Sequence, residues 1–370
     1  MTQEDLSRVS VVLPSLDPDE KLPAVIDGLL EYGFSDIILV NDGSKPENLH
    51  YFTDAARLHP EIHLLHHSVN RGKGAALKTA FQWYMENRPD GAGVITVDGD
   101  NQHHPEDTRR CALRMLETGH LILGIRDFNQ PNVPFRSRAG NHITSFVFKV
   151  FVGMTISDTQ TGLRAIPSSA LPALTRVGGD RFEYETNMLL ALKERNIPFE
   201  EEKIRTVYIE ENKSSHFHAV RDSWRIYKLI LAHFFRYTLS SFFCALLDEV
   251  LYAFVSWLCR GHLAGLLLTA VPTLCARTVS SLCNFFVNHR LVFHSTLPTG
   301  KAMLRYYAAA IPMLLAQLAL TEGLYRIFSV SPQDTLIRAI LYAAVMIFLY
   351  VVNFMIQQRW VFQKKDKENA

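Results

Sequence analysis

Two carboxylates with one glycine between them follow an apolar run in the segment Val94–Asp107. The run predicts a buried strand that ends in Asp98-Gly-Asp100, with Gln102 two residues later and Pro105 opening a helix. At the C-terminal edge of a parallel sheet, two carboxylates at this spacing can share one hard divalent cation. Mg²⁺ or Mn²⁺ takes such oxygen ligands and keeps coordination sites for a diphosphate. Because the motif alone also fits an ordinary polar turn, the segments around it decide its meaning.

Three other segments bring polar side chains or glycines directly after predicted strands. Pro14 and Ser15 form a turn that leads into an acidic helix start, and Asp42 stands just after the second strand, where it can accept hydrogen bonds from a base or ribose. The two glycines of NRGKGAAL permit close backbone approach at a helix N-terminus, and Lys73 between them can meet phosphate. This loop lacks the glycine spacing and the Lys-Ser/Thr pair of a Walker sequence, and no G-x-G-x-x-G follows the first strand.

The elements that position these residues alternate between strands and helices over residues 1–215. Short apolar runs predict strands at Val9–Leu13, Asp36–Val40, Ile62–Leu65 and Val94–Val97. Helical spacing between them predicts helices at Lys21–Tyr32, Glu47–Leu58 and Ala75–Glu86. The alternation predicts a Rossmann-like α/β domain with a mainly parallel sheet, and ligands bind such sheets at the carboxyl edge.

Taken in order, the motifs of this domain resemble those of glycosyltransferase family 2, which has the GT-A fold. They are PSLDPDE, VNDGS, NRGKGAAL, VDGDNQHHPED, GIRD, SRAGN, DTQTGLRAI and YIEENKSSHF, and the resemblance runs from Val9 to about Arg225. The closer match is the polyprenyl-phosphate branch, which includes the dolichol-phosphate mannose synthases. The resemblance implies an inverting transferase that moves a hexose from a nucleotide-sugar to undecaprenyl or dolichyl phosphate on the cytoplasmic face, for cell-surface polysaccharide or glycan assembly.

The resemblance also implies a donor site at the carboxyl edge of the sheet. Asp98 and Asp100, assisted by Gln102, would hold Mg²⁺ or Mn²⁺ and the donor diphosphate. Asp42 would contact the nucleotide. The nucleotide-sugar site as a whole would comprise Pro14, Ser15, Asp42, Lys73 and Asp98.

On the acceptor side, the resemblance implies a set of basic residues. Arg126 of GIRD and Arg138 of SRAGN match positions that handle phosphate charge, and they complete a catalytic set with the two aspartates. DTQTGLRAI matches an acceptor-side loop, and the lipid phosphate is expected to be gripped by Arg138, Arg164 and Lys213. A phosphate monoester is largely ionised at neutral pH, so it can attack without a general base. The candidate bases, for which structural or acceptor-positioning roles are favoured, are Asp158, Glu183 and Glu185.

The second part of the chain is apolar and is predicted to form a four-helix, all-α transmembrane domain over 236–362. From Leu239 to Ile356 there are seven Lys/Arg and four Asp/Glu, and four stretches are long enough to cross a bilayer, about 239–258, 263–285, 306–328 and 335–356. Basic residues gather in the loop between the second and third stretches and in the tail 363–370. The positive-inside rule therefore puts both termini in the cytoplasm of a multi-pass protein of the inner or plasma membrane.

Residues 216–235, just before the first span, carry aromatic and apolar residues at helical spacing. Trp224, Tyr227 and Ile230 recur on one side, and arginines and a lysine lie between them. This distribution favours an amphipathic helix in the membrane interface, and the alternative is a helix packed on the soluble domain.

The membrane part also repeats itself. RYTLSSFF at Arg236 and RYYAAAIP at Arg305 are 69 residues apart, and the same 69 separate NFFVNHRLVF at Asn284 from NFMIQQRWVF at Asn353. The shared offset predicts two parallel copies of one helical hairpin. The region resembles GtrA-like domains, which implies an anchor and a role in moving lipid-linked sugars across the bilayer.

Asp248 and Arg277 fall near the middle of the first and second predicted spans. Ionised groups at that depth cost at least ~2.5–3.5 kcal/mol each, so they normally face a protein interior or pair. One interpretation is that they hold the bundle together, and the other is that they line a polar path for a sugar-phosphate head group.

Two other functions are compatible with parts of this sequence. A processive polysaccharide synthase should carry Q-x-x-R-W, but Ile356 occupies the position of the first Gln. A non-enzymatic lipid-sugar carrier would not need the intact metal and phosphate motifs. The net charge of +1 and the lack of nucleic-acid-binding motifs argue against nucleic acid as a partner. The expected partners are a nucleotide-sugar, polyprenyl phosphate and the lipid bilayer, and association with a second copy stays open.

Overall fold

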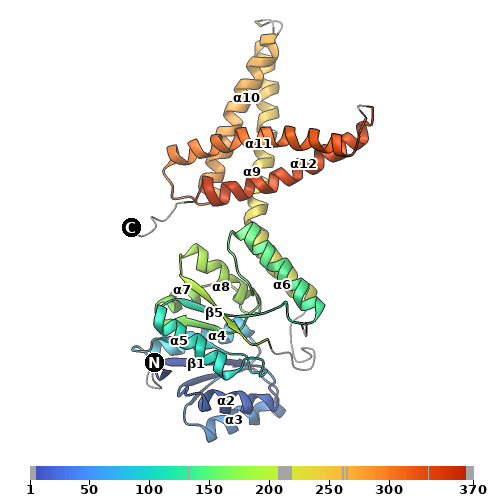
Figure 1. Cartoon of the computed structure of the whole chain (residues 1–370). Helices are drawn as coiled ribbons and strands as arrows, with labels where there is room; N and C mark the ends of the chain where they lie inside the picture. The colour runs from blue at the N-terminus through green and yellow to red at the C-terminus, as the bar shows by residue number, and fades with distance from the viewer. Residues whose placement is uncertain are drawn as a thin grey trace. The chain divides into compact units, whose positions relative to one another are not determined.

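The computed structural model describes residues 6–131, 133–206, 219–260, 262–263, 266–331 and 333–363. The chain divides into two compact units, Met1–Ile230 and Leu231–Ala370. The first unit contains a β-sheet with helices around it, and the second is made of long helices (Figure 1).

A seven-stranded sheet forms the centre of the first unit, in the order β3-β2-β1-β4-β6-β5-β7. Its strands are β1 (Val9–Ser15), β2 (Ile37–Asp42), β3 (Ile62–His67), β4 (Gly93–Thr96), β5 (Leu121–Arg126), β6 (Arg164–Pro167) and β7 (Phe199–Ile204). Among the described strands, β6 alone runs antiparallel to its neighbours. The mainly parallel α/β sheet predicted from the sequence is confirmed. The carboxyl ends of β1, β2, β4 and β5 therefore lie at one edge.

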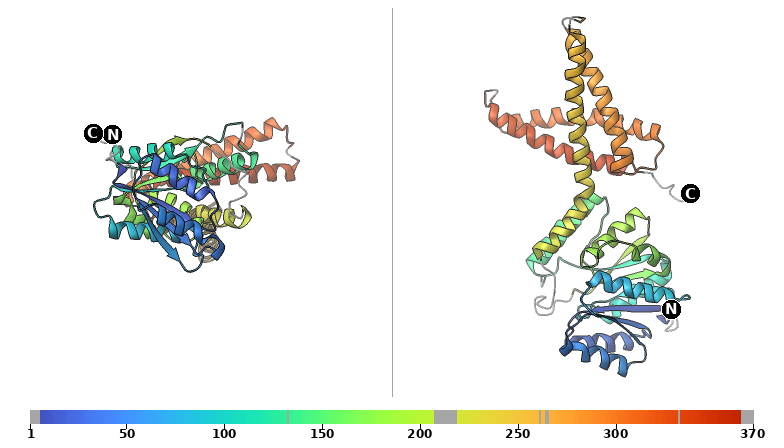
Figure 2. Two further views of the ribbon diagram at one scale, coloured as in Figure 1. Left: turned by 90° about the horizontal axis from the view of Figure 1, so that it is seen from below. Right: turned by 180° about the vertical axis from the view of Figure 1, so that it is seen from behind.

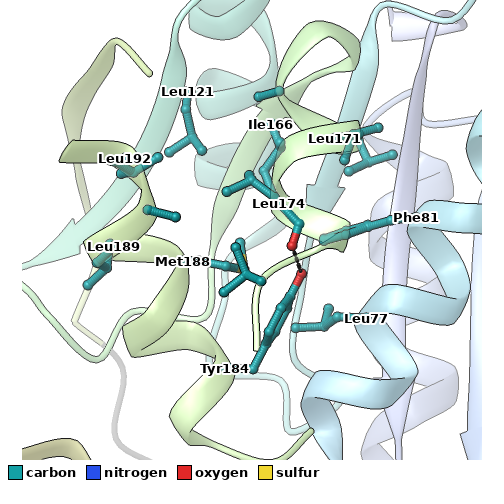
Figure 3. Packing of buried hydrophobic residues seen from close by; sticks show 14 of the residues in the cluster. Leu77, Phe81, Leu121, Ile166, Leu171, Leu174, Tyr184, Met188, Leu189 and Leu192 are labelled. Atoms are coloured by element: carbon teal, nitrogen blue, oxygen red, sulfur yellow. Dashed lines mark hydrogen bonds between the residues drawn. The ribbon is translucent and has the colours of Figure 1, made fainter. Parts of the chain in front are cut away.

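Each face of the sheet has its own hydrophobic core, because alternate strand residues point to opposite sides. One core combines Val12, Ile38 and Val40 with residues of α4 (Lys73–Asn87), α7 (Leu171–Thr175) and α8 (Glu183–Glu194). The other combines Val11, Ile37 and Leu39 with residues of α2 (Lys21–Glu31), α3 (Leu49–Leu58) and α5 (Pro105–Thr118). Figure 3 shows the first core, in which the buried Tyr184 hydroxyl donates to the Leu174 carbonyl at 2.9 Å.

Four helices of the second unit are long and apolar enough to cross a membrane. The helices are α9 (Ala219–Cys259), α10 (Leu266–Val287), α11 (Thr299–Ile327) and α12 (Thr335–Ile356). The candidate spans are Phe234–Cys259, Leu267–Val292, Thr299–Ile327 and Thr335–Val361. The prediction of four apolar helices is confirmed. The third starts seven residues before the predicted 306, because helical geometry continues through its basic first turns.

Helix α9 differs from the prediction of a separate interfacial helix before the first span. It runs from Ala219 to Cys259 as one 41-residue helix, which can be followed in Figure 2. No glycine or proline occurs in this stretch, so no residue type within it favours a break. Residues 216–218 and the side chains of Trp224, Tyr227 and Ile230 lie outside the described part of the chain.

The sequence repeat recurs in the contacts of the second unit. A π-helical turn follows α10 as η5 (Asn288–Val292) and follows α12 as η6 (Gln357–Val361). Asn288 Nδ2 donates to Gln357 Oε1 at 3.2 Å, and these residues are 69 apart in the sequence. The rings of Phe293 and Phe362, which are also equivalent in the repeat, stack with centroids 5.1 Å apart. Equivalent positions of the two copies therefore contact each other.

Crossed contacts between the two hairpins follow the same relation. Asn353 Nδ2 of the second copy donates to the Tyr237 hydroxyl of the first at 3.0 Å. The Tyr306 hydroxyl of the second copy donates to Asn284 Oδ1 of the first at 3.1 Å. At the 69-residue offset, Tyr237 matches Tyr306 and Asn284 matches Asn353, so one residue pairing is made twice. Such reciprocity is the mark of a two-fold relation between two copies of a surface.

Candidate active site

Asp98 and Asp100 lie at the carboxyl edge of the sheet, just beyond β4. The backbone N–H of Val97 donates to the Val12 carbonyl at 3.0 Å, which continues the strand pairing up to the residue before Asp98. Asn101 then takes a positive φ of 62° and reverses the chain, and the Gln102 N–H donates to Asp100 Oδ1 at 3.1 Å. This turn presents both carboxylates at the edge, as the spacing predicts.

Lys73, the first residue of α4, is tied to Asp98. Gly72 before it has a φ of 101°, and a Cβ there would collide with the Asp180 carbonyl, so glycine allows this entry into the helix. The Lys73 ammonium lies 2.7 Å from Asp98 Oδ1 and 2.9 Å from Glu185 Oε1. Burial alone would lower the pKa of Lys73, but the two carboxylates outweigh burial and raise it. Lys73 therefore stays cationic between two anions.

The two aspartates have opposite protonation tendencies. Burial would raise the pKa of Asp98, but Lys73 and His103 outweigh it and hold that pKa far below its ordinary value. Burial, followed by the negative charge of Asp98, raises the pKa of Asp100. The neighbouring cations therefore stabilise the charged form of Asp98 much more than that of Asp100.

This donor set fits Mg²⁺ or Mn²⁺. Both ions take carboxylate oxygens, and a divalent charge beside Asp100 would offset the repulsion that raises the pKa of that residue. Within the described ranges, no group of three or more His, Cys, Asp or Glu side chains forms a closed metal site. Because Mg²⁺ and Mn²⁺ take more ligands than two carboxylates supply, a cation held by Asp98 and Asp100 would keep coordination sites for a diphosphate.

The chain before β6 closes over Asp98. Arg164 of β6 pairs with Thr96 of β4 in antiparallel register, so the residues before Arg164 reach the edge where Asp98 lies. Thr96 Oγ1 donates to the Gly162 carbonyl at 2.6 Å, and a Cβ on Gly162 would collide with Asp98 Oδ2. The acceptor-side loop implied by the resemblance therefore contacts the first aspartate.

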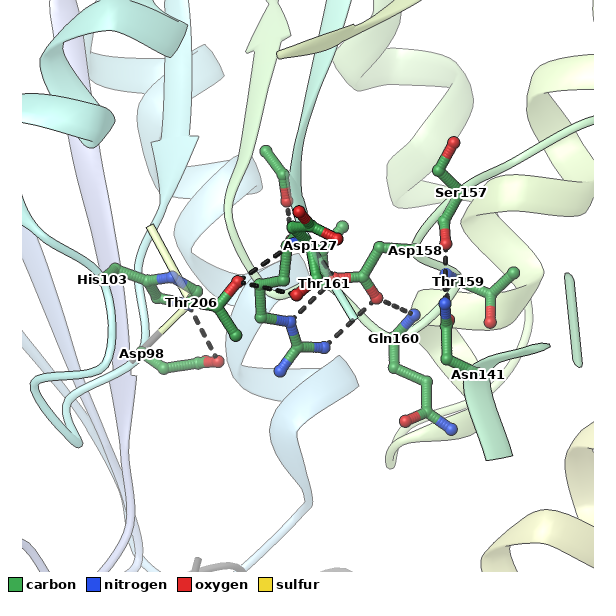
Figure 4. Close-up of polar contacts among 12 residues, drawn as sticks. Asp98, His103, Asp127, Asn141, Ser157, Asp158, Thr159, Gln160, Thr161 and Thr206 are labelled. Atoms are coloured by element: carbon green, nitrogen blue, oxygen red, sulfur yellow. Dashed lines mark hydrogen bonds and ion pairs between the residues drawn. The ribbon is translucent and has the colours of Figure 1, made fainter. Parts of the chain in front are cut away.

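Arg126, the last residue of β5, forms a two-point ion pair with Asp158. Its Nε and Nη2 donate to the Asp158 carboxylate at 2.7 and 3.2 Å, and Asp158 is fully buried. Asp158 is thus the counter-ion that orients Arg126. Figure 4 shows this loop beside Asn141 of α6 (Phe135–Val147), whose Nδ2 donates to the Ser157 carbonyl at 2.7 Å.

Arg164, predicted to grip the lipid phosphate, lies inside the first unit instead. It is 2% exposed, and its Nε and Nη1 donate to the carbonyls of Thr161 and Glu185 at 3.1 and 2.8 Å. Burial lowers its pKa. The reason is topological: β6 is flanked by β4 and β5, so its side chains point into the packed layers. The structure therefore supports a role for Arg164 beneath the site rather than in direct contact with lipid phosphate.

Arg138 of α6 is half-buried and holds the loop that follows β5. Its Nε and Nη2 donate to the carbonyls of Phe128 and Gln130 at 2.9 and 2.8 Å. Its binding to phosphate stays a prediction. Lys213, the third residue expected at the lipid phosphate, lies outside the described residues.

Asp42 is the last residue of β2 and is buried, whereas the sequence predicted an accessible residue after the strand. His67 Nδ1 lies 2.7 Å from Asp42 Oδ1, and the N–H groups of Arg71 and Gly72 donate to the two carboxylate oxygens at 2.9 and 2.7 Å. Asp42 thus shapes the loop that carries Lys73. Sequence reasoning missed His67, although strands β2 and β3 pair residue for residue and put it opposite Asp42.

Two further residues adjoin the aspartates. His103, which the sequence analysis did not assign, is buried, and its Nε2 lies 3.5 Å from Asp98 Oδ2. The sequence signal for it was its position directly after Gln102. Ser15 belongs to β1, as does Pro14, rather than to a turn. A Cβ on Gly99 would lie 3.6 Å from Ser15 Oγ, so Ser15 is close to the aspartates.

The family of the chain is shown by a sequence match that covers every site residue described above. The model of glycosyl transferase family 2 matches residues 10–220, more than half of the chain. The chain belongs to glycosyltransferase family 2. A second model, the GtrA/DPMS transmembrane domain, matches residues 236–362 of this transferase. The enzyme therefore combines a GT-A-like domain with a transmembrane domain, as the resemblances implied.

Curated relatives of this transferase include enzymes with polyprenyl-phosphate acceptors in their names. An uncharacterized protein of Methanocaldococcus jannaschii is 28% identical over 61% of this chain and 93% of its own length. UDP-N-acetylglucosamine–dolichyl-phosphate N-acetylglucosaminyltransferase of Methanococcus voltae is 25% identical over 55% of this chain and 86% of its own. Undecaprenyl-phosphate 4-deoxy-4-formamido-L-arabinose transferase of Photorhabdus laumondii is 31% identical over 45% of this chain and half of its own.

Among solved structures, glucosyl-3-phosphoglycerate synthase from Mycobacterium tuberculosis shares 15% sequence identity with this transferase. It covers 63% of this chain and 84% of its own, with a TM-score of 0.49.

Proposed function

We propose that this transferase moves a hexose from a nucleotide-sugar to a polyprenyl phosphate with inversion, on the cytoplasmic side of the inner or plasma membrane. The observation that carries the proposal is the carboxyl-edge site, in which Lys73 contacts Asp98 and Asp100 lies two residues further on, in a chain that also has a transmembrane domain. An enzyme so anchored meets lipid acceptors in its own bilayer. The names of the dolichyl- and undecaprenyl-phosphate relatives support the same acceptor class.

In the proposed reaction, an oxygen of the lipid phosphate attacks C1 of the sugar, and the bond from C1 to the diphosphate breaks. The acceptor is ionised, so no side chain needs to remove a proton from it. The contacts of the candidate bases support this view, because Asp158 is paired with Arg126 and Glu185 with Lys73. Mg²⁺ or Mn²⁺ held by Asp98 and Asp100 would supply charge stabilisation of the leaving diphosphate. Lys73, which directly follows Gly72, would add a second positive charge beside the leaving diphosphate.

The transmembrane domain is proposed to anchor the enzyme and to aid movement of the product to the other leaflet. Arg277 Nε lies 3.5 Å from Asp248 Oδ2, and Ser280 Oγ donates to Asp248 Oδ1 at 2.7 Å. The Asp248 side chain is 11% exposed and the Arg277 side chain 75%. These contacts support the ion pair as a link between α9 and α10, and the exposed guanidinium supports a polar path.

The test is to incubate membranes that contain the protein with a panel of labelled nucleotide-sugars and to separate the lipid phase. We expect one donor to yield a sugar linked to a lipid through a single phosphate, and that donor identifies the sugar. A polymeric product would instead indicate a processive synthase. No labelled product from any donor would favour a non-enzymatic carrier.

A further inference from the structure

Strand β7 carries three consecutive glutamates, Glu200, Glu201 and Glu202. Neighbouring residues of a strand point to opposite faces of the sheet, so Glu201 points away from the other two. Glu200 faces α5, where its carboxylate lies 2.9 Å from Arg114 Nη2, and Glu202 also pairs with an arginine of α5. Glu201 is in register with Leu123 of β5, which belongs to the core that α4, α7 and α8 cover. Glu201 therefore lies on the face opposite to α5.

Both carboxylate oxygens of Glu201 accept hydrogen bonds from one residue of a loop. The Ser157 N–H donates to Oε1 at 2.6 Å, and the Ser157 hydroxyl donates to Oε2 at 2.7 Å. Ser157 belongs to residues 153–163, which connect η2 (Phe148–Val152) to β6 without a helix or strand of their own. Hydrogen bonds to an ionised acceptor are about twice as strong as those between neutral groups. The two bonds therefore fix both the position and the orientation of Ser157.

Asn141 of α6 gives the same loop a second attachment, which Figure 4 shows. Its Nδ2 donates to the Ser157 carbonyl at 2.7 Å, and its Oδ1 accepts from the Thr159 N–H at 3.3 Å. The fully buried Asp158 lies between these two residues of the loop and makes the two-point ion pair with Arg126. The position of Arg126 therefore depends on Asp158, and the position of Asp158 depends on the two attachments.

We propose that Glu201 is a positioning residue for sugar transfer, because it fixes Arg126 through Ser157 and Asp158. Arg126 ends β5 at the carboxyl edge of the sheet, and it is the member of the proposed catalytic set that would meet phosphate charge. Glu201 acts through these residues rather than by contact with the reacting atoms. Its role in transfer rests on the proposed function, whereas its hold on the loop does not.

The second half of the loop has attachments that do not involve this glutamate. The Thr161 hydroxyl donates to the Gly124 carbonyl of β5, and the Thr96 hydroxyl donates to the Gly162 carbonyl at 2.6 Å. These two bonds hold the part of the loop that comes close to Asp98. Removal of the glutamate should therefore disturb the first half of the loop and leave the metal-binding turn in place.

Steady-state kinetics of the full-length enzyme in vesicles test this role, with the donor that the labelled panel identifies and a polyprenyl phosphate. Glu201→Ala should lower kcat by about tenfold or more, since misplacing a group at the site by about 1 Å can cost about a hundredfold. The KM for the nucleotide-sugar should change by less than about twofold, because the turn that carries Asp98 is untouched. Glu201→Gln keeps an oxygen for the Ser157 N–H and offers an N–H to its hydroxyl, so this variant should retain most of the activity.

Glu200→Ala and Glu202→Ala are the matched controls, because they remove carboxylates of the same strand that contact α5 instead. Both should leave kcat unchanged. Ser157→Ala removes one of the two bonds to Glu201 and should lower kcat by about threefold, which decides the matter if Glu201→Ala does not fold. A loss of kcat in Glu201→Ala no larger than in the controls, a matching rise in the donor KM, or full activity of Ser157→Ala would overturn the proposal.

Hydrogen–deuterium exchange followed by mass spectrometry tests the loop contact without a transfer assay. In full-length Glu201→Ala, the amides of residues 153–159 should exchange about tenfold faster than in the unaltered protein. The amides of residues 97–103 should keep their rates. If the unaltered protein transfers no sugar from any donor, the proposed function fails. Unchanged exchange over residues 153–159 would instead refute the positioning role, whatever the transfer assay shows.

Discussion

Asp98 and Asp100 are the residues on which the metal proposal depends. We expect Asp98→Asn and Asp100→Asn each to lower sugar transfer by about a hundredfold or more, because each removes a charged ligand from the leaving-group site. The fold should persist, since both carboxylates lie in an edge turn rather than in a core. Transfer rates over a Mn²⁺ titration measure the effect, and Asp54→Asn on the surface of α3 is the control. Near-normal, metal-dependent rates in either variant would contradict the assignment.

Lys73 contacts the same carboxylate that would hold the cation, so its removal should have two opposite effects. Lys73→Met leaves Asp98 and Glu185 without their ammonium. We expect tighter Mn²⁺ binding in the absence of nucleotide, and weaker binding of nucleoside diphosphates, because a phosphate-facing charge is lost. Calorimetric titration of Mn²⁺ and of a nucleoside diphosphate panel measures both.

The matched control for Lys73 is Lys78→Met. Lys78 lies on the same helix and pairs with Asp180 at 2.9 Å, away from the two aspartates. It should leave both affinities unchanged. Weaker Mn²⁺ binding by Lys73→Met would show that the ammonium does not compete with the cation for Asp98.

Gly162 sets how close the loop before β6 comes to Asp98. Gly162→Ala puts a methyl group against Asp98 Oδ2 and should abolish most transfer while leaving the global fold intact. Gly178→Ala is the control, since a Cβ there meets nothing within 4 Å. Circular dichroism and transfer assays distinguish the two effects. Full activity of Gly162→Ala would mean that the loop and Asp98 can move apart without consequence.

At the scale of helices, the contact between η5 and η6 should be a coupled pair. Asn288→Leu leaves Gln357 Oε1 without its donor in a buried site and should cost about 1–3 kcal/mol of unfolding free energy. The double variant Asn288→Leu, Gln357→Leu should cost less than the sum of the single changes, because neither buried partner is then left alone. The free energy of unfolding would be measured in mixed detergent micelles for the unaltered protein, the two single variants and the double variant. Strictly additive losses would show that the two side chains are not coupled.

At the scale of the whole molecule, sugar transfer and product movement should be separable. We expect Arg277→Ala to spare transfer in detergent and to block the appearance of lipid-linked sugar on the far leaflet of vesicles. Arg326→Ala is the control, because its similarly exposed side chain pairs within one turn of α11. Normal translocation by a folded Arg277→Ala protein would exclude the polar path, and failure to fold or insert would favour a structural ion pair.

Local sequence determined the elements and the ends of the strands. Periodicity of apolar residues predicted the parallel sheet and four apolar helices, because strand and helix periods arise within a few residues. The proximity of Asp98 and Asp100 was also predictable, because the two residues are separated by a single glycine in one turn. The repeat with its offset of 69 residues was also detectable in the sequence, although the crossed contacts between its two copies could not be predicted from it.

Tertiary structure decided which polar groups lie at the carboxyl edge of the sheet and which are buried in the fold. His67 reaches Asp42 only through the β2–β3 register, and Gly162 reaches Asp98 only because β6 runs antiparallel to β4. Arg164 looked like a phosphate ligand in its motif, but its strand has neighbours on both sides and is buried. Burial and pairing arise from segments far apart in the chain, and local residue patterns do not carry that information.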